Sequence, residues 1–286
     1  MLREIRDLGF EYAELGHGIC ASLVPGILEA VDAGEIKISS LHNFCPLPLG
    51  VTRPSPNLYS FSAEEPRERE LAIKHTLKTL EFAGRVQAPL VVLHLGGIEM
   101  KDYTGRLCEM LERGGKGPPQ YGKLRDEATA SREARKGKAV ERVYVALRKI
   151  LPEAERRGVK LGIENRQALE EIPPDGDIEK FFRDFDVPNI VYWHDTGHAQ
   201  IKENLGFIRH AQHLESLSRW LAGFHIHDVV FPAGDHAAPG TGIVDFAALK
   251  PFVKPQHIKV FELSPLLPVD AVKRGVAHVK AIWGNE

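Results

Sequence analysis

Hydrophobic positions along the chain follow two patterns that alternate with each other. Short, mostly apolar runs of strand type occur at residues 11–16, 37–43, 90–95, 160–165, 190–195, 223–228 and 259–264. Between these runs, apolar residues recur at helical spacing, as in Ile73, Leu77 and Leu80, and again over 140–154 and 269–283. Strands that alternate with helices are typical of repeated βα units and a parallel sheet covered on both faces. The pattern therefore predicts an α/β fold.

One segment interrupts this alternation. Residues 101–138 are polar and glycine-rich at their centre, and residues 101–139 hold ten lysines and arginines against six acidic residues. Two interpretations stay open: a lid-like insertion over a functional site, or a solvated charged insertion with helices of its own. No Pro/Ser-rich linker divides the chain, which predicts a single domain over 1–286. Ser62 and Glu65 have the spacing of a capping box and predict the start of the helix that contains Ile73.

Composition excludes several classes of protein. The 286 residues are 43% hydrophobic and 27% charged, which is a globular and not a disordered composition. A net charge of −2 argues against a protein that binds nucleic acid or a membrane surface. The three cysteines form no C-x-x-C pair, and we find no signal peptide and no apolar run of membrane-spanning length. These features predict a cytoplasmic protein.

Histidine is the unusual component, with 13 copies. Many of them, together with acidic and amide residues, stand at or just after the predicted strand ends. Because the carboxyl ends of parallel barrel strands meet at one mouth, we expect these side chains to gather there. The candidates are His42, Asn43, His94, Glu164, Asn165, Asp195, His198, His225, His227 and Glu262, with His236 in the loop that follows.

Three of these candidates are carboxylates, and their assembly requires a cation. Glu164, Asp195 and Glu262, with His225 or His227, would surround one point at the mouth. Carboxylates brought together repel one another unless positive charge lies between them. Carboxylate and imidazole ligands suit Mn²⁺, Mg²⁺ or Co²⁺, and additional histidines favour Zn²⁺. Each residue alone has an ordinary structural explanation, but the repetition on four consecutive strands favours a metal centre.

The same residues resemble a known family. The runs LGIEN, HDTGH, FHIHD, DHAAPGTGIVDF and VFELS resemble the xylose isomerase-like TIM barrels, which include sugar phosphate isomerases and epimerases and also endonuclease IV. The resemblance covers essentially the whole chain, and its most specific part runs over 161–264. It implies a TIM (β/α)8-type barrel, although we count seven strands.

The chain begins on the helix that follows the first strand in this family, so the first strand is expected to be missing. An open seam, a neighbouring chain that covers it, or a start upstream of Met1 would each account for this, with an exposed edge beside 11–16.

The resemblance also implies a set of site residues. In ketose 3-epimerases of the family, Glu, Asp, His and Glu at the last four strand ends hold the metal. Here these are Glu164, Asp195, His225 and Glu262. His225 is preferred to His227 because an acidic residue, Asp228, follows it by three positions. Glu164 and Glu262 are also the implied catalytic pair. The expected substrate-binding residues are His42, His94, Asn165, His198, His227 and His236, the last standing where epimerases carry an arginine.

The implied activity is that of a metal-dependent isomerase or epimerase. One divalent ion, Mn²⁺ before Mg²⁺, Co²⁺ or Zn²⁺, would polarise a sugar, sugar phosphate or related hydroxy-ketone. The glutamates would then transfer protons through a metal-bound enediolate. The partner expected is a small polyol or ketose, with the positive charge of 101–139 favouring an anionic one, and no nucleic acid or membrane. Relatives often form homodimers or homotetramers.

Other functions stay open within the same superfamily. An endonuclease IV-like zinc phosphodiesterase is favoured by His42 and His94, which match two of its zinc-ligand positions, and also by His198. It is disfavoured by the absence of a spacer between Asp235 and His236 and by the net charge of −2. A dehydratase with the same enolate chemistry and a non-catalytic sugar-binding protein are the remaining alternatives. Metal stoichiometry distinguishes the nuclease, with three zinc ions, from the epimerase, with one.

Overall fold

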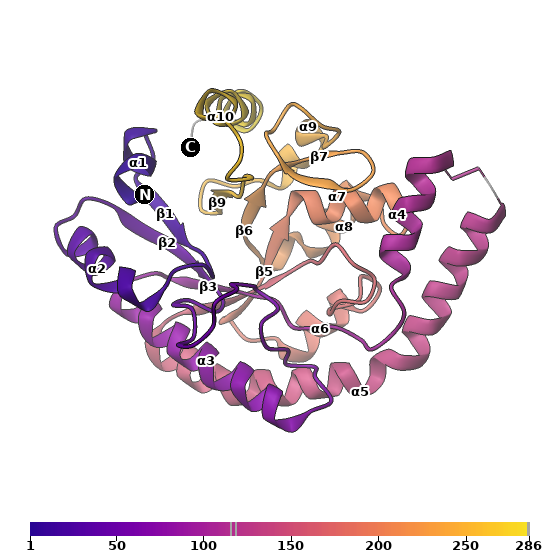
Figure 1. The fold of residues 1–286 in the computed structure, drawn as a ribbon, viewed down its shortest axis with the longest axis horizontal. Helices are drawn as coiled ribbons and strands as arrows, with labels where there is room; N and C mark the ends of the chain where they lie inside the picture. The colour runs from indigo at the N-terminus through magenta and orange to yellow at the C-terminus, as the bar shows by residue number, and fades with distance from the viewer. Residues whose placement is uncertain (115, 118, 285–286) are drawn as a thin grey trace. The chain divides into compact units, whose positions relative to one another are not determined.

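The computed structural model describes residues 1–114, 116–117 and 119–284 of the chain, and its strands alternate with helices throughout (Figure 1). Seven parallel strands follow one another in the order β1-β2-β3-β4-β5-β6-β9, and β7 and β8 form a separate antiparallel pair. The strands are β1 Tyr12–Leu15, β2 Lys37–His42, β3 Leu90–Leu93, β4 Lys160–Glu164, β5 Ile190–Asp195, β6 Leu221–Ile226, β7 Asp228–Val230, β8 Gly234–Ala237 and β9 Ile258–Phe261. The helices are α1 Leu2–Asp7, α2 Val24–Asp32, α3 Pro66–Arg85, α4 Tyr103–Gly114, α5 Pro119–Arg157, α6 Ile178–Phe185, α7 Thr196–Leu205, α8 His210–Leu217, α9 Phe246–Leu249 and α10 Val269–Trp283, with short 3-10 turns η1 Ala21–Leu23, η2 Ser218–Trp220 and η3 Lys250–Phe252.

The chain divides into two compact units, which we describe separately. Unit 1 comprises Met1–Gly97, Lys138–Glu164 and Phe185–Val191, and unit 2 comprises Ile98–Gly137, Asn165–Asp184 and Tyr192–Glu286, of which residues 115, 118, 285 and 286 are outside the described part.

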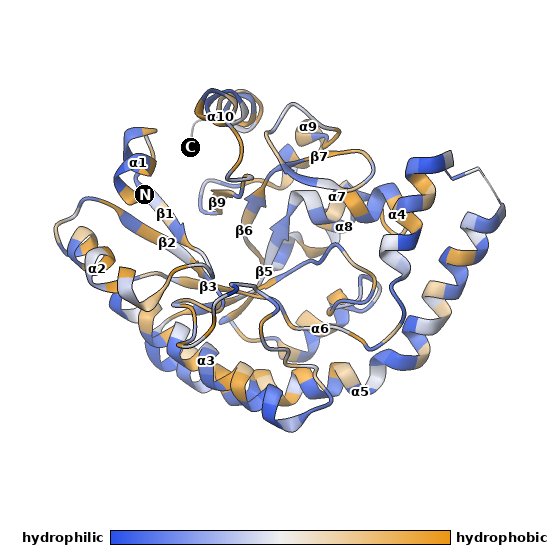
Figure 2. Cartoon of the chain, viewed as in Figure 1, coloured by the Kyte–Doolittle hydropathy of each residue, from blue (hydrophilic) through white to orange (hydrophobic). Residues whose placement is uncertain are grey.

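Unit 1 contains the parallel strands β1 to β4, each paired with the next, with a register shift between Ala13 and Glu14 in the β1–β2 pair. All four residues of β3 are buried, as expected for a strand covered on both faces. Helix α3 packs on β2 and β3 (Figure 1) and shows the alternating hydrophobic and hydrophilic surface of an amphipathic helix (Figure 2). Strand β1 is at one end of the strand order, which agrees with the edge predicted beside residues 11–16.

Unit 2 contains the end of β5 together with β6 and β9, which pair in parallel. Helix α7 begins directly after β5 and contacts both β6 and the β7–β8 pair. It ends at Gly206, whose φ of 81° is a left-handed value that glycine adopts without strain. Because β5 runs straight into α7, the residues at this junction have little freedom of position.

Two expectations about helices require correction. The helix that contains Ile73 begins at Pro66, and its N-cap is Glu65, whose carboxylate accepts the amide hydrogen of Arg67. The predicted Ser62–Glu65 capping box is therefore wrong, and the Ser62 hydroxyl instead donates to the carbonyl of Gly97. A proline at the first helical position, where no hydrogen-bond donor is needed, explains the shift. The apolar stripe of α10 is only partly buried, since Val269 is 56% exposed.

The segment 101–138 is helical in its described part. It forms α4 and the first half of α5, and residues 115 and 118 of the insertion lie outside the described residues. Helix α4 buries Tyr103, Leu107 and Leu111 and contacts α7. The charge count of this segment does not reveal its apolar stripe, and helices of its own were one of the two interpretations that the sequence left open. Among the described residues, every helix is too short or too polar to cross a lipid bilayer.

Candidate metal centre

Three of the predicted metal-binding and substrate-binding residues lie at strand ends in unit 1, and all three are buried. His42 is the last residue of β2, Glu164 is the last of β4, and His94 follows β3. The Nε2 atom of His94 lies 2.7 Å from Glu164 Oε2, and the corresponding atom of His42 lies 3.9 Å from the same oxygen. The structure therefore gathers two histidines on one carboxylate, as the strand-end pattern predicts.

The other seven predicted residues lie in unit 2, where three of them form a carboxylate–imidazole cluster. His225 Nδ1 lies 3.0 Å from Glu262 Oε2 and 3.9 Å from Asp195 Oδ2. Asp195 and His225 are completely buried, whereas 29% of the Glu262 side chain is exposed. Glu262 is thus the member of this group that solvent or a small molecule can reach.

The four residues from Asp195 to His198 each have a distinct structural task. Asp195 is the N-cap of α7, and its Oδ1 accepts the amide hydrogen of His198 at 2.7 Å. The Thr196 hydroxyl donates to the carbonyl of His227 and accepts its amide hydrogen. A Cβ at Gly197 would lie 1.9 Å from the His227 ring, so only glycine fits there. The HDTGH run therefore positions the carboxylate of Asp195 and the imidazole of His227.

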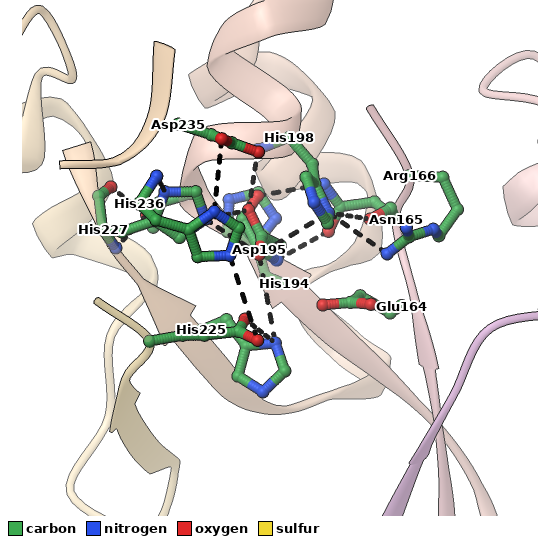
Figure 3. Close-up of polar contacts among 12 residues, drawn as sticks. Glu164, Asn165, Arg166, His194, Asp195, His198, His225, His227, Asp235 and His236 are labelled. Carbon is green, nitrogen blue, oxygen red and sulfur yellow. Dashed lines mark hydrogen bonds and ion pairs between the residues drawn. The ribbon is translucent and has the colours of Figure 1, made fainter. Parts of the chain in front are cut away.

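His227 contacts the same carboxylate from the other side (Figure 3). Its Nε2 lies 3.0 and 3.1 Å from the two Asp195 oxygens, and its Nδ1 accepts the amide hydrogen of His236 at 2.9 Å. Burial lowers the pKa of His227, but Asp195 outweighs burial and raises it to about 9, against the opposing amide of His236. In either protonation state the Nε2 hydrogen is directed at Asp195. Both ring nitrogens of His227 therefore have protein partners, which favours His225 as the metal ligand.

Asp235 and His236 form a dyad beside the cluster (Figure 3). His236 Nδ1 lies 3.2 Å from Asp235 Oδ1, and its ring stacks on His227 with the centroids 4.5 Å apart. The hydrogen bond that the His236 ring donates to Asp235 raises the pKa of His236. His236 has a φ of 54°, an uncommon left-handed value for a residue with a side chain, and such strain concentrates at functional sites. Its Nε2 lies 4.0 Å from Glu262 Oε1, which places the dyad at the accessible side of the cluster.

Asp228 is a structural residue that the sequence reasoning used only to choose between histidines. Its buried carboxylate accepts amide hydrogens from Val229, Gly240, Gly242 and Val244 at 2.8–2.9 Å. These bonds fold the 238–244 loop around one side chain. A Cβ at Gly242 would lie 2.4 Å from Asp228 Oδ1, which explains the second glycine of the PGTG run. The signal for this role was the pairing of an acidic residue with a following Gly-rich loop.

Arg166 is the other residue that the sequence reasoning missed. It is buried, its Nε donates to Glu171 at 3.1 Å, and its NH1 lies 3.4 Å from His198 Nδ1 (Figure 3). Its position directly after Asn165 in the LGIEN run was the available signal. The guanidinium extends the polar lining of this region beyond the residues predicted from strand ends.

The donor set of unit 2 fits a divalent cation. Asp195 and Glu262 each place a carboxylate oxygen within 4 Å of His225 Nδ1, and this set of two carboxylates and one imidazole suits the borderline and hard divalent metals. Atoms of His227, His236 and Glu262 also lie within 4.8 Å of one another. The Nε2 hydrogen of His227 is already directed at Asp195, however. The group formed by Asp195, His225 and Glu262 is therefore the better metal site.

The comparisons with known proteins agree with this picture. The sequence profile of the xylose isomerase-like TIM barrels matches residues 2–263. The chain belongs to this family. Its fold is accordingly an α/β TIM barrel, with seven parallel strands among the described residues. No match was found among curated protein sequences.

Solved structures with sugar epimerase names share the fold at low identity. A D-tagatose 3-epimerase-like protein matches with a TM-score of 0.69 and 17% identity over 98% of this chain and 91% of its own. A 3-keto-D-glucoside 4-epimerase from E. coli matches with a TM-score of 0.66 and 16% identity over 98% and 92%. A D-psicose 3-epimerase from Clostridium cellulolyticum H10, solved with D-tagatose, matches with 0.66 and 14% over 99% and 92%.

Proposed function

We propose that this protein is a divalent-metal-dependent isomerase or epimerase of a sugar, sugar phosphate or related hydroxy-ketone. The observation that carries the proposal is the convergence of Asp195, His225 and Glu262 at the ends of successive strands of unit 2. The names of the structural neighbours support a sugar as the substrate class. Family membership supports the same class of chemistry.

In this proposal four residues hold the metal: Glu164, Asp195, His225 and Glu262. Glu164 is the residue directly before Asn165, whose side chain bonds the Asp195 main chain. A bound divalent ion would supply Lewis acidity that makes a C–H bond next to a carbonyl more acidic.

Glu262 is the proposed base at the accessible side, because its carboxylate is partly exposed while His225 and Asp195 are buried. Glu164 is the proposed second proton carrier, and His94 at 2.7 Å holds its carboxylate in one orientation. His198 and His236 are proposed to contact substrate oxygens. His42, His94 and His227 are expected to orient carboxylates and line the substrate.

Solvent deuterium exchange tests the proton-transfer roles. Metal-loaded protein is incubated in D₂O with a panel of ketoses, ketose phosphates and hydroxy-ketones, and deuterium at carbon is measured by mass spectrometry. Wild type is expected to exchange with at least one member, and Glu164→Gln and Glu262→Gln are expected to abolish the exchange. His257→Gln, at a histidine that pairs with the Lys254 amide, is the matched control. Normal exchange in both glutamine variants would refute the roles.

A second function has one specific observation in its favour. His42 and His94 both face Glu164 in unit 1, which offers additional metal-binding side chains of the kind an endonuclease IV-like zinc phosphodiesterase uses. Metal content after loading with excess Zn²⁺ distinguishes the two functions. One tightly bound ion per chain supports the isomerase, and three support the nuclease.

A further inference from the structure

The Asn165 carboxamide is bonded to the main chain of one residue through both of its polar groups. Its Oδ1 accepts the amide hydrogen of Asp195 at 2.7 Å, and its Nδ2 donates to the Asp195 carbonyl at 3.0 Å. Both residues are buried, with exposures of 2% and 0%. A carboxamide carries the same donor and acceptor as a peptide group. The side chain therefore takes the place of a peptide unit beside the end of β5.

The main chain of Asn165 also bonds a second residue of the site, His198. Its carbonyl lies 3.0 Å from His198 Nδ1, so the ring donates its Nδ1 hydrogen there. Its amide hydrogen is donated to the Trp193 carbonyl. One residue thus bonds the strand before Asp195, the main chain of Asp195 and the ring of His198.

The carboxylate of Asp195 has contacts of its own. Its oxygens accept from the His198 amide and from the His227 ring. The Asn165 bonds instead fix the main chain from which the carboxylate projects. Residues that hold a metal-ligating carboxylate affect metal affinity strongly even though they do not touch the metal.

We propose that Asn165 is a positioning residue that sets the orientation of Asp195 and His198, in place of the substrate contact expected from its strand-end location. The consequence for catalysis rests on the proposed function, whereas the positioning itself is a property of the metal-free protein. The Thr196 hydroxyl likewise bonds both the carbonyl and the amide of His227, so a side chain fixes the main chain in the same way at the next strand end.

The test uses Asn165→Asp, which is isosteric and keeps the oxygen that accepts the Asp195 amide hydrogen but replaces the donor with an oxygen. Asn165→Ala removes both bonds. Asn189→Ala is the matched control. The side-chain amide of Asn189 donates to the main-chain carbonyl of Val159, near the opposite end of β5. Each variant is measured as the full-length protein.

The first readout is amide hydrogen exchange by NMR in the metal-free protein. The His198 amide bonds the Asp195 carboxylate and not Asn165, so its exchange reports the orientation of Asp195. It is expected to exchange about 10-fold faster in both Asn165 variants, with α8 and α10 unchanged, and at the wild-type rate in the control. An unchanged His198 amide would overturn the proposal. Equal acceleration throughout unit 2 would also overturn it, because Asn165 would then serve the fold alone.

The second readout is Mn²⁺ affinity by titration. Asn165→Asp is expected to bind Mn²⁺ about 10–100-fold more weakly than wild type and Asn189→Ala to bind as wild type does. Equal affinity in wild type and Asn165→Asp would overturn the positioning of a metal ligand. If wild type itself binds no divalent metal while the His198 exchange responds, the proposed function fails and the positioning role stands.

Discussion

Unit 2 contains two sets of histidines that are close in sequence and opposite in chemistry. The site histidines are His198, His225, His227 and His236, and each has a carboxylate oxygen within 4 Å. The network histidines are His194 and His210, which are also buried and are joined to each other by a hydrogen bond, and His213 is buried as well. His194 and Asp195 are neighbours on β5, where successive side chains point to opposite faces. One step along a strand therefore separates the two environments.

The network histidines are held as neutral rings. Gln200 Nε2 donates to Glu203 and Asn204, so its Oε1 is the acceptor for His210 Nδ1. His210 Nε2 must then accept from His194 Nε2 at 2.9 Å, and His194 Nδ1 must accept from the Tyr192 hydroxyl at 2.7 Å. This single polarity satisfies every hydrogen bond without a charge.

The electrostatic consequence follows from the neighbours. Burial lowers the pKa of His194 and His213, and it lowers that of His210 to about 3. Near the carboxylates the pKa of His227 is raised to about 9 and that of His236 is also raised. Burial alone thus does not identify a functional histidine. A facing carboxylate reverses the direction of the pKa shift that burial causes.

The largest expected difference between the two sets is in metal binding. Replacing His225 with glutamine removes a proposed ligand and is expected to weaken Mn²⁺ binding by more than about 100-fold, beyond the usual effect of outer residues. His210→Gln, in the network, is expected to stay within about threefold of wild type. Competition titration with a chelator measures both, and wild-type affinity in His225→Gln would remove His225 from the site.

For the free energy of unfolding, the larger effect is expected from the network histidines. His210→Leu leaves the His194 Nε2 hydrogen and the Gln200 oxygen without partners in a buried place. The free energy of unfolding of the metal-free protein should fall by about 2–3 kcal/mol, since each unsatisfied buried group costs about 1–3 kcal/mol. Urea unfolding measures the change. A loss below about 0.5 kcal/mol would mean that the hydrogen-bond chain contributes little.

The two sets also predict opposite pH dependences. The lowered pKa of His210 means that its contribution to stability is present above the unfolded value near 6.5 and is lost as pH falls toward about 3. The contribution of His227 is present below about 6.5 and is lost as pH rises through about 9. Urea unfolding of the metal-free protein between pH 7 and 4.5 should show a decline of up to about 1.4 kcal/mol per pH unit for each network histidine.

His210→Leu supplies the control for that pH dependence. Between pH 7 and 4.5, its free energy of unfolding should decline less steeply than that of wild type. The difference in slope should equal the contribution of one histidine. An identical slope in the two proteins would show that other groups cause the acid loss.

The smallest effect is expected at the end of the network. Tyr192→Phe removes the hydroxyl that donates to His194 Nδ1 and keeps the ring. The free energy of unfolding should fall by about 1 kcal/mol, the usual value for one hydrogen bond. Mn²⁺ affinity should not change. A measurable loss of metal affinity in Tyr192→Phe would show that the network histidines also support metal binding, contrary to this comparison.

Sequence periodicity was sufficient to find the seven strands of the parallel sheet, because short apolar runs buried on both faces differ clearly from amphipathic helices, but it did not predict the β7–β8 pair. It located β5 at its observed bounds and the others within a few residues. It was not sufficient for the helical segment 103–114, where charge obscures an apolar stripe, or for the start of α3, where Pro66 and not Ser62 decides the boundary.

The candidate site divides in the same way. Strand-end chemistry identified Asp195, His225 and Glu262, which the structure brings together. It dismissed His210 and His213 as packing or surface residues and did not reveal the chain of hydrogen bonds that joins His210 to His194. Partners that are distant in sequence leave no periodic signal, so this network could not be read from the chain.

By itself the sequence determined the family, the alternation of strands and helices, and the residue types at the strand ends. Those features depend on local spacing, which the chain carries directly. Only the tertiary structure decided the task of each polar side chain. Asn165 bonds the Asp195 main chain, Asp228 gathers the amides of a loop, and the Nε2 hydrogen of His227 is directed at Asp195. A side chain's role depends on the donors and acceptors that folding places around it, and these come from segments far apart in the chain.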